Sequence, residues 1–149
     1  AAQGMVFGRP EFGVAADDLL VAEFGAIVPL FRGGKSEAEV AADEKPPGRV
    51  PSDVELDWPG FRVSRIDLDT GRRTPFLRNR SGRPASATPP DDLTTPAGTG
   101  LERPIQLEWG PDGSLYVVDF GIVEFEPSGM TAHAHTGAVW RVRWEGTPR

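Results

Sequence analysis

The sequence predicts an all-β fold built from two related sheet units, and three observations support this prediction. A seven-residue segment ending in an acid, an aromatic residue and a glycine occurs twice, at residues 19–25 (LLVAEFG) and 115–121 (LYVVDFG). Each copy is followed downstream by a second strand-like segment, residues 63–68 and residues 139–144. The 149-residue chain also holds 18 glycines and 15 prolines, which separate short apolar segments. Repetition of sheet units is typical of solenoids, arrays and propellers.

About two such units fit the length of the chain. A propeller blade is a four-stranded sheet of roughly 40 to 50 residues, and a closed ring typically takes about four to eight blades. The sequence therefore predicts about two blades of a β-propeller, incomplete on their own. Because two blades leave apolar faces and strand edges open to water, we expect the remaining blades to come from the same precursor or from another subunit.

Composition excludes several classes of function. The net charge of −6 argues against nucleic acid or an anionic membrane as the main partner. No apolar run approaches the roughly 20 residues of a transmembrane segment, and no segment has the order of regions found in a signal peptide. The absence of cysteine excludes disulfides, thiol catalysis and Cys-ligated metal centres.

The first unit covers residues 1–77, after a poorly defined lead-in around Arg9-Pro10. Residues 19–24 are apolar on both faces, which is typical of a strand buried on both sides. An insertion spans residues 32–60, where the capping-box spacing from Ser36 predicts a short helix through Glu44. Residues 61–68 and 73–77 are then expected to form a hairpin around a glycine turn.

A tract rich in Pro, Ser, Thr and Gly, residues 78–100, is expected to be a mobile loop between the units. The second unit covers residues 101–149. Residues 105–109 alternate as in a half-buried strand, and Gly110-Pro111-Asp112-Gly113 is a strong turn signal before the strand at 115–120. An insertion at residues 122–136 precedes a last strand from Ala138 to Trp144, so this unit is expected to lack one strand.

The stretch from Arg103 to Gly121 (RPIQLEWGPDGSLYVVDFG), continued by residues 136–142 (TGAVWRV), resembles the C-terminal blades of the glucose/sorbosone dehydrogenase family. Segments of the first unit follow in the order of that family's penultimate blade. The resemblance implies a six-bladed propeller, and many members use pyrroloquinoline quinone (PQQ) with calcium to oxidise sugars. It also implies a periplasmic or secreted protein and a small sugar or polyol as ligand.

Carrying the family's site onto this chain gives a mixed result. Quinone-binding members place two arginines, two positions apart, where guanidinium forks hold the cofactor's carboxylates. Arg103 matches the first arginine, whereas Ile105 stands where the second would be. Gly25 or a neighbour replaces a lysine that many members carry, and the histidine that takes the sugar's proton has no counterpart. The other reading of Arg103 is a salt bridge to Glu102 or to a carboxylate of the next blade.

Four further side chains are candidate metal or ligand residues. Glu23 and Asp119 occupy equivalent positions at the ends of repeated strands, where carboxylates could hold calcium or a sugar hydroxyl, or accept N–H groups of their own turns. His133 and His135 have an i, i+2 spacing that would aim both imidazoles to one side of an extended segment and suit a transition metal, or they lie in an ordinary surface loop.

Tryptophans supply a further surface for a ligand. Trp58, Trp109, Trp140 and Trp144 could stack on sugar rings, although three of them lie on or beside apolar strand faces and are expected to fill the space between blades.

Two functions of different class follow from these patterns. The chain is either the C-terminal part of a PQQ-dependent sugar or polyol dehydrogenase, with its site completed by other polypeptide, or a non-catalytic extracytoplasmic subunit for binding or assembly. On its own the chain is expected to oxidise nothing.

Overall fold

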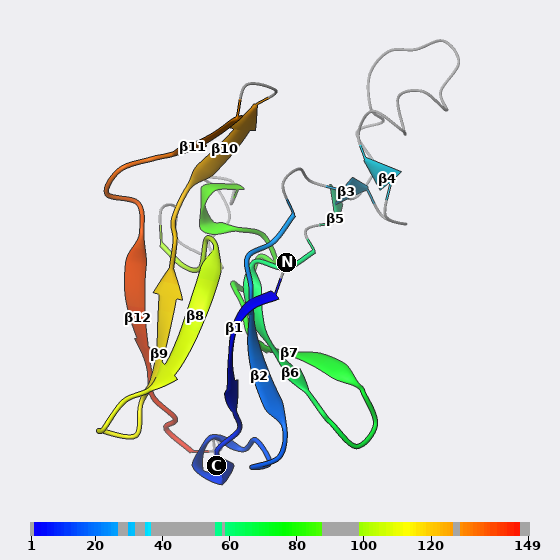
Figure 1. Cartoon of the computed structure of the whole chain (residues 1–149), viewed down its shortest axis with the longest axis vertical. Coiled ribbons are helices and arrows are strands. Elements are labelled where there is room, and N and C mark those ends of the chain that lie inside the picture. The colour runs from blue at the N-terminus through cyan, green and yellow to red at the C-terminus, as the bar shows by residue number, and fades with distance from the viewer. Residues whose placement is uncertain are drawn as a thin grey trace.

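The structure is a computed structural model and describes residues 2–26, 30–31, 35–36, 56–57, 59–87, 99–126 and 129–146. Within these ranges the chain is all-β, as the sequence predicts, and every strand pairing is antiparallel (Figure 1). The first sheet has the order β1-β2-β6-β7, with β1 (Ala2–Phe7), β2 (Leu19–Glu23), β6 (Arg62–Ile66) and β7 (Arg73–Leu77). The second has the order β12-β9-β8, with β8 (Pro104–Trp109), β9 (Leu115–Asp119) and β12 (Ala138–Val142).

Smaller elements lie within both insertions. The first contributes a three-stranded sheet of order β4-β3-β5, with β3 (Leu30–Phe31), β4 (Lys35–Ser36) and β5 (Leu56–Asp57). Ser36 therefore lies in a strand, and the remainder of the helix expected through Glu44 lies outside the described residues. The second insertion forms a hairpin of β10 (Val123–Glu126) and β11 (Gly129–Ala132). Two short 3₁₀ helices, η1 (Pro10–Phe12) and η2 (Ala85–Ala87), complete the described elements.

Strand β1 is the element that sequence patterning misses, because we expected only a poorly defined lead-in. Its sequence, AQGMVF, alternates weakly and contains a glycine. Gly4 is needed because β1 closely approaches β8: a Cβ there would lie 2.6 Å from Cα of Gln106 and 2.8 Å from the carbonyl oxygen of Ile105. Gly4 allows the two backbones to approach closely, but it has no side chain and so interrupts the apolar alternation that would predict a strand.

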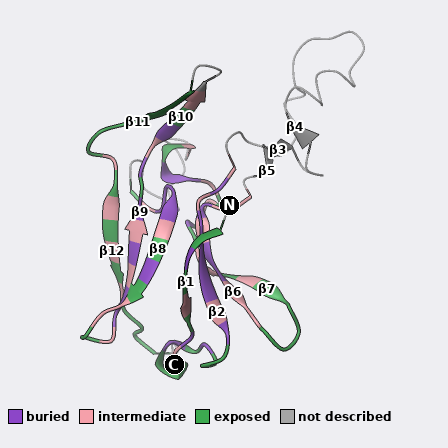
Figure 2. Cartoon of the chain, viewed as in Figure 1, coloured by how far each residue is buried: buried purple, intermediate pink, exposed green. Residues whose placement is uncertain are grey.

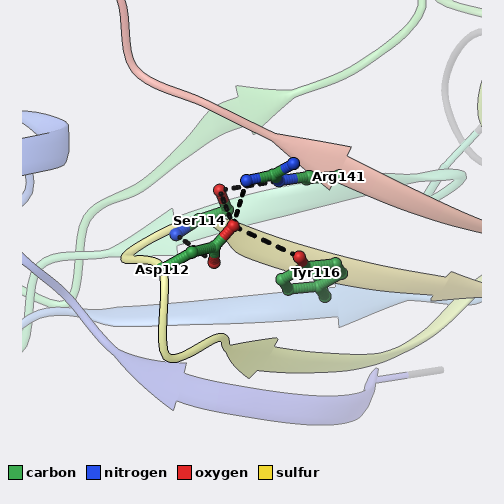
Figure 3. A network of polar contacts seen from close by, with 4 residues as sticks. All are labelled: Asp112, Ser114, Tyr116 and Arg141. Atoms are coloured by element: carbon green, nitrogen blue, oxygen red, sulfur yellow. Dashed lines mark hydrogen bonds and ion pairs between the residues drawn. The ribbon is translucent and has the colours of Figure 1, made fainter.

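The predicted turn between β8 and β9 is organised by the side chain of Asp112 (Figure 3). Its carboxylate accepts the backbone N–H of Ser114 at 3.1 Å and the Ser114 hydroxyl at 3.0 Å. The Tyr116 hydroxyl donates to the same carboxylate at 3.3 Å, and the Arg141 guanidinium forms an ion pair with it. One short side chain thus joins the turn to β9 and to the neighbouring strand β12.

The two sheets meet where β1 and β8 lie side by side, and buried stretches gather on β2, β8 and β9 around this junction (Figure 2). The apolar core joins residues of both sheets. From the first sheet it includes Leu20, Ala22 and Val63, and from the second Leu107, Leu115 and Val117, all with 0 % exposure. Alternation along a strand means that Leu20 and Ala22 share one face of β2, while Leu115 and Val117 share one face of β9.

The two copies of the repeat use opposite faces in this contact. When residues 19–25 are aligned with residues 115–121, Leu20 and Ala22 correspond to Tyr116 and Val118, which point away from the core. Val21, in turn, corresponds to the buried core residue Val117, but lies outside the core cluster. The first sheet therefore contacts the second head to tail. On the side of the first sheet away from the core, Met5 and Phe7 of β1 are exposed, whereas Val21 and Glu23 of β2 are buried, at 5 % and 8 % exposure.

Hydrogen bonds of Asn79 join the two described ends of the 78–100 segment. Asn79 is 7 % exposed, and its amide donates at 2.8 Å to the carbonyls of Arg83 and Leu101, while its oxygen accepts the Leu101 N–H at 2.8 Å. The expected mobility of this segment stays a prediction, and its middle, residues 88–98, lies outside the described residues.

None of the helices in the described ranges is long and apolar enough to span a bilayer.

Candidate functional site

The end of β9 places the Asp119 carboxylate at the centre of a dense set of N–H donors. One oxygen accepts the backbone N–H groups of Arg103 at 2.7 Å and Gly121 at 3.0 Å. The other accepts the backbone N–H of Glu102 at 2.6 Å and the indole N–H of Trp140 at 3.4 Å. Asp119 is 4 % exposed, and a carboxylate so placed fixes the backbone entering β8 against the backbone leaving β9.

Glu102 lies beside Asp119 and is also buried, at 7 % exposure. Its two oxygens accept the hydroxyl and the backbone N–H of Ser86, both at 2.8 Å. Because each carboxylate oxygen can accept a second hydrogen bond, Glu102 keeps acceptor capacity after binding Ser86.

These two acids line one wall of a cavity of about 320 Å³. The other polar and aromatic residues of its lining include Ser86, His135, Thr136 and Trp140. The volume is at the small end of the roughly 300–1,000 Å³ found for ligand sites, so the cavity has the size for a small molecule. Carboxylates, an imidazole, hydroxyls and an indole are groups that bind neutral polar ligands by hydrogen bonds and stacking.

The structure separates the two predicted histidines. His133 forms a pair with Glu124, with 3.3 Å between Nε2 and Oε2, whereas His135 lines the cavity. The chain is not extended between them, because residues 134 and 135 form a turn and His135 has φ +64°. The i, i+2 spacing therefore does not by itself place both imidazoles on one side.

Glu23 occupies the equivalent position in the first sheet, and its surroundings differ from those of Asp119. One of its oxygens accepts from Arg73 Nη2 at 2.5 Å and from Arg62 Nε at 3.3 Å. Glu23 and Arg73 line a second cavity, of about 390 Å³. Two guanidinium groups around one carboxylate disfavour a cation at this position, since they have already neutralised its charge.

Arg103 bridges the two sheets from the start of β8. Its Nη1 donates to the carbonyls of Phe24 at 3.3 Å and Ala26 at 3.1 Å, and its guanidinium lies 4.7 Å from the ring centroid of Phe24. The rings of Phe61 and Phe125 lie 4.9 Å and 5.4 Å away. Burial lowers the pKa of the guanidinium, while the nearby charges of Glu102 and Asp119 act in the opposite direction.

This arrangement does not fit a cofactor carboxylate at Arg103. The residue is 6 % exposed, and neither of the two cavities described above includes Arg103 in its lining. Both carbonyl contacts use Nη1, so a quinone carboxylate could meet only the Nε and Nη2 edge, where the buried Nε has no hydrogen-bond partner and lies among aromatic rings. Ile105 supplies no second fork, so these residues do not form the paired arginine site of the quinone-binding members.

No group of three or more potential metal-ligating side chains comes together within the described ranges. The calcium expectation therefore stays a prediction. Sequence reasoning named Asp119, His135 and Trp140, which the fold brings to one cavity. It missed the place of Glu102 and Ser86 in the cavity lining, because both depend on how the segment between the units folds back, which no local spacing records.

Comparisons of the chain with models of known protein families, with curated proteins and with solved structures find no match.

Proposed function

We propose that the two sheets are neighbouring blades of a propeller-type array and that the chain is a non-catalytic unit that binds a small sugar or polyol. The head-to-tail packing supports the first part, because a ring or array requires each unit to contact the next with a different face from the one it shows to the previous unit. The resemblance to the glucose/sorbosone dehydrogenase blades supports the same arrangement.

The cavity at Glu102 and Asp119 is the observation that carries the binding function. A polyhydroxylated ligand offers O–H donors to the free acceptor positions of Glu102, and its remaining oxygens accept from donors such as the imidazole of His135. The indole of Trp140 adds an apolar surface for ring C–H groups. Hydroxyls suit this lining because they donate hydrogen bonds to carboxylate oxygens and accept them from N–H and O–H groups.

A dehydrogenase function has weaker support. It rests on the resemblance, and the one matched cofactor-side residue, Arg103, is engaged by the carbonyls of Phe24 and Ala26. In that reading, PQQ would supply the electron acceptor and other polypeptide the proton acceptor. The position of Arg103 therefore favours the binding function.

The test is calorimetric titration of the chain with D-glucose and with myo-inositol. We expect binding that His135→Ala weakens by about tenfold, the scale of one lost hydrogen bond. Trp140→Ala should weaken it to a similar extent, because it removes the apolar surface for ring C–H groups. His133→Ala is the matched control, since His133 pairs with Glu124, and it should leave the affinity unchanged. Absence of binding by the unaltered chain, or an equal loss in His133→Ala, would overturn the proposal.

A further inference from the structure

The open face of the second sheet has a defined chemistry. We define the Val139 face by Tyr116, Val118, Val139 and Arg141, which the register of β9 with β12 places side by side away from the core. Val139 is 66 % exposed, although it lies in the middle of a paired strand. Tyr116 and Arg141 are held at one end of this face by Asp112 (Figure 3). The face is therefore pre-organised and partly apolar.

The face of the first sheet that points away from the core is exposed along its edge strand, β1. We define the Met5 face by Met5, Phe7, Leu19, Val21 and Ile66, which the registers of β1, β2 and β6 place on the side away from the core. Val21 is 5 % exposed and lines the same cavity as the ion pair of Glu23 and Arg73, whereas Met5 and Phe7 are 58 % and 62 % exposed. Large apolar side chains at this exposure, on strands rather than on loops, are characteristic of a surface that another element covers.

The repeat identifies which surface fits each of these faces. The Val139 face corresponds, residue for residue along β2 and β9, to the face of the first sheet that carries Leu20 and Ala22. Inside the chain, that face is covered by the Leu115 and Val117 face of the second sheet. The Met5 face, with Leu19 and Val21, is the repeat equivalent of this covering face. Contact between a Val139 face and a Met5 face would therefore repeat the contact that the two sheets already make in the core.

We propose that the Val139 face of one copy of this chain binds the Met5 face of a second copy, head to tail. The inference rests on the proposed blade arrangement and extends the intramolecular contact between the two sheets from copy to copy. A heterologous contact of this kind generates a ring if the rotation between units closes, and a filament if it does not. Since propeller rings hold about four to eight sheets, two sheets per chain correspond to rings of roughly two to four copies.

The test uses one charged substitution on each face and measures mass by light scattering over a range of concentrations. Val139→Glu disables the Val139 face and Phe7→Glu disables the Met5 face, and both side chains are exposed, so the fold is preserved. We expect the unaltered chain to associate. The dissociation constant of each variant should be at least about 30-fold higher than that of the unaltered chain. Leu68→Glu, at 51 % exposure in the β6–β7 turn, is the matched control and should associate as the unaltered chain does.

Mixing the two variants provides the decisive measurement. Val139→Glu keeps an intact Met5 face and Phe7→Glu keeps an intact Val139 face, so the mixture should form a 1:1 heterodimer that cannot grow further. A monomeric unaltered chain at every concentration, a mixture that stays monomeric, or equal dissociation by Leu68→Glu would each overturn the proposal. None of the three substitutions lines the Glu102 cavity, so sugar titration of the monomeric variants tests the proposed binding function separately.

Discussion

Arg103 and Phe24 join the two sheets through one side chain: the guanidinium lies 4.7 Å from the ring centroid and donates to the Phe24 carbonyl at 3.3 Å. The contact spans 79 residues of sequence and lies at the same end of the sheets as the two repeated aromatic-glycine turns. Phe24 and Phe120, the aromatic residues of these turns, are themselves in edge contact, with 6.2 Å between ring centroids. The turns therefore form a second, polar and aromatic, connection beside the apolar core.

We predict that Arg103→Ala lowers the free energy of unfolding by about 2–4 kcal/mol. The substitution removes hydrogen bonds from a charged donor, at about 1.5–3 kcal/mol in total, together with a buried cation–π contact. Urea denaturation measures the loss. Arg143→Ala is the matched control, because Arg143 is exposed, and should change stability by less than about 0.5 kcal/mol. Equal stability of both variants would contradict a bridging role for Arg103.

We predict that Gly60→Ala is more destabilising than Gly71→Ala. Both glycines have positive φ, +92° and +70°, which costs an alanine about 1–2 kcal/mol. A Cβ at Gly60 would also lie 2.4 Å from Cα of Gly25, whereas one at Gly71 would meet no atom within 4 Å. The backbone clash should add roughly 1–3 kcal/mol. Thermal and urea unfolding of the two variants measure the difference, and equal losses would show that Gly25 and Gly60 do not approach closely.

The stabilisation by Asp112 is predicted to depend on pH. The Ser114 backbone N–H is the main cause that holds the pKa of Asp112 at about 2, below its ordinary 3.8, with the Ser114 hydroxyl and Arg141 contributing further. Because the folded pKa is the lower one, the stabilisation is complete above the ordinary value and is lost as pH falls from about 4 towards 2. Asp112→Asn should therefore be less stable than the unaltered chain at neutral pH, and the gap should narrow over this acidic range.

Carboxyl NMR titration measures the same pKa directly. In Arg141→Ala most of the downward shift of the Asp112 pKa should remain, since the backbone N–H of Ser114 is the larger cause. A return to the ordinary value in that variant would assign the shift to the ion pair instead.

Local patterning predicted most of the sheet strands. The hairpin of β6 and β7, the alternation of Leu107 and Trp109 in β8, and the turn organised by Asp112 agree with the sequence-based prediction, because each depends on residues close together in the chain. Strand β1 was not predicted, because its glycine is required by a contact with β8, about a hundred residues away in the sequence.

The candidate site also has some features that the sequence predicts and others that depend on tertiary contacts. Position in the repeat identified Glu23 and Asp119 as equivalent carboxylates, yet one binds two arginines and the other binds backbone N–H groups. The sequence indicated Glu102 only as a possible salt-bridge partner of Arg103. Its place in the cavity depends on Ser86, which the folding of the segment between the units brings to it.

The sequence by itself determined that the chain is all-β, where most strands of the two larger sheets run and which residues alternate on each strand, because strand periodicity and turn chemistry act over a few residues. The tertiary structure alone decided that the two copies of the repeat contribute opposite faces to the shared core, and that Asp119, Glu102 and His135 line one cavity. Both follow from contacts between distant segments, where burial of one sheet face against another outweighs any local preference.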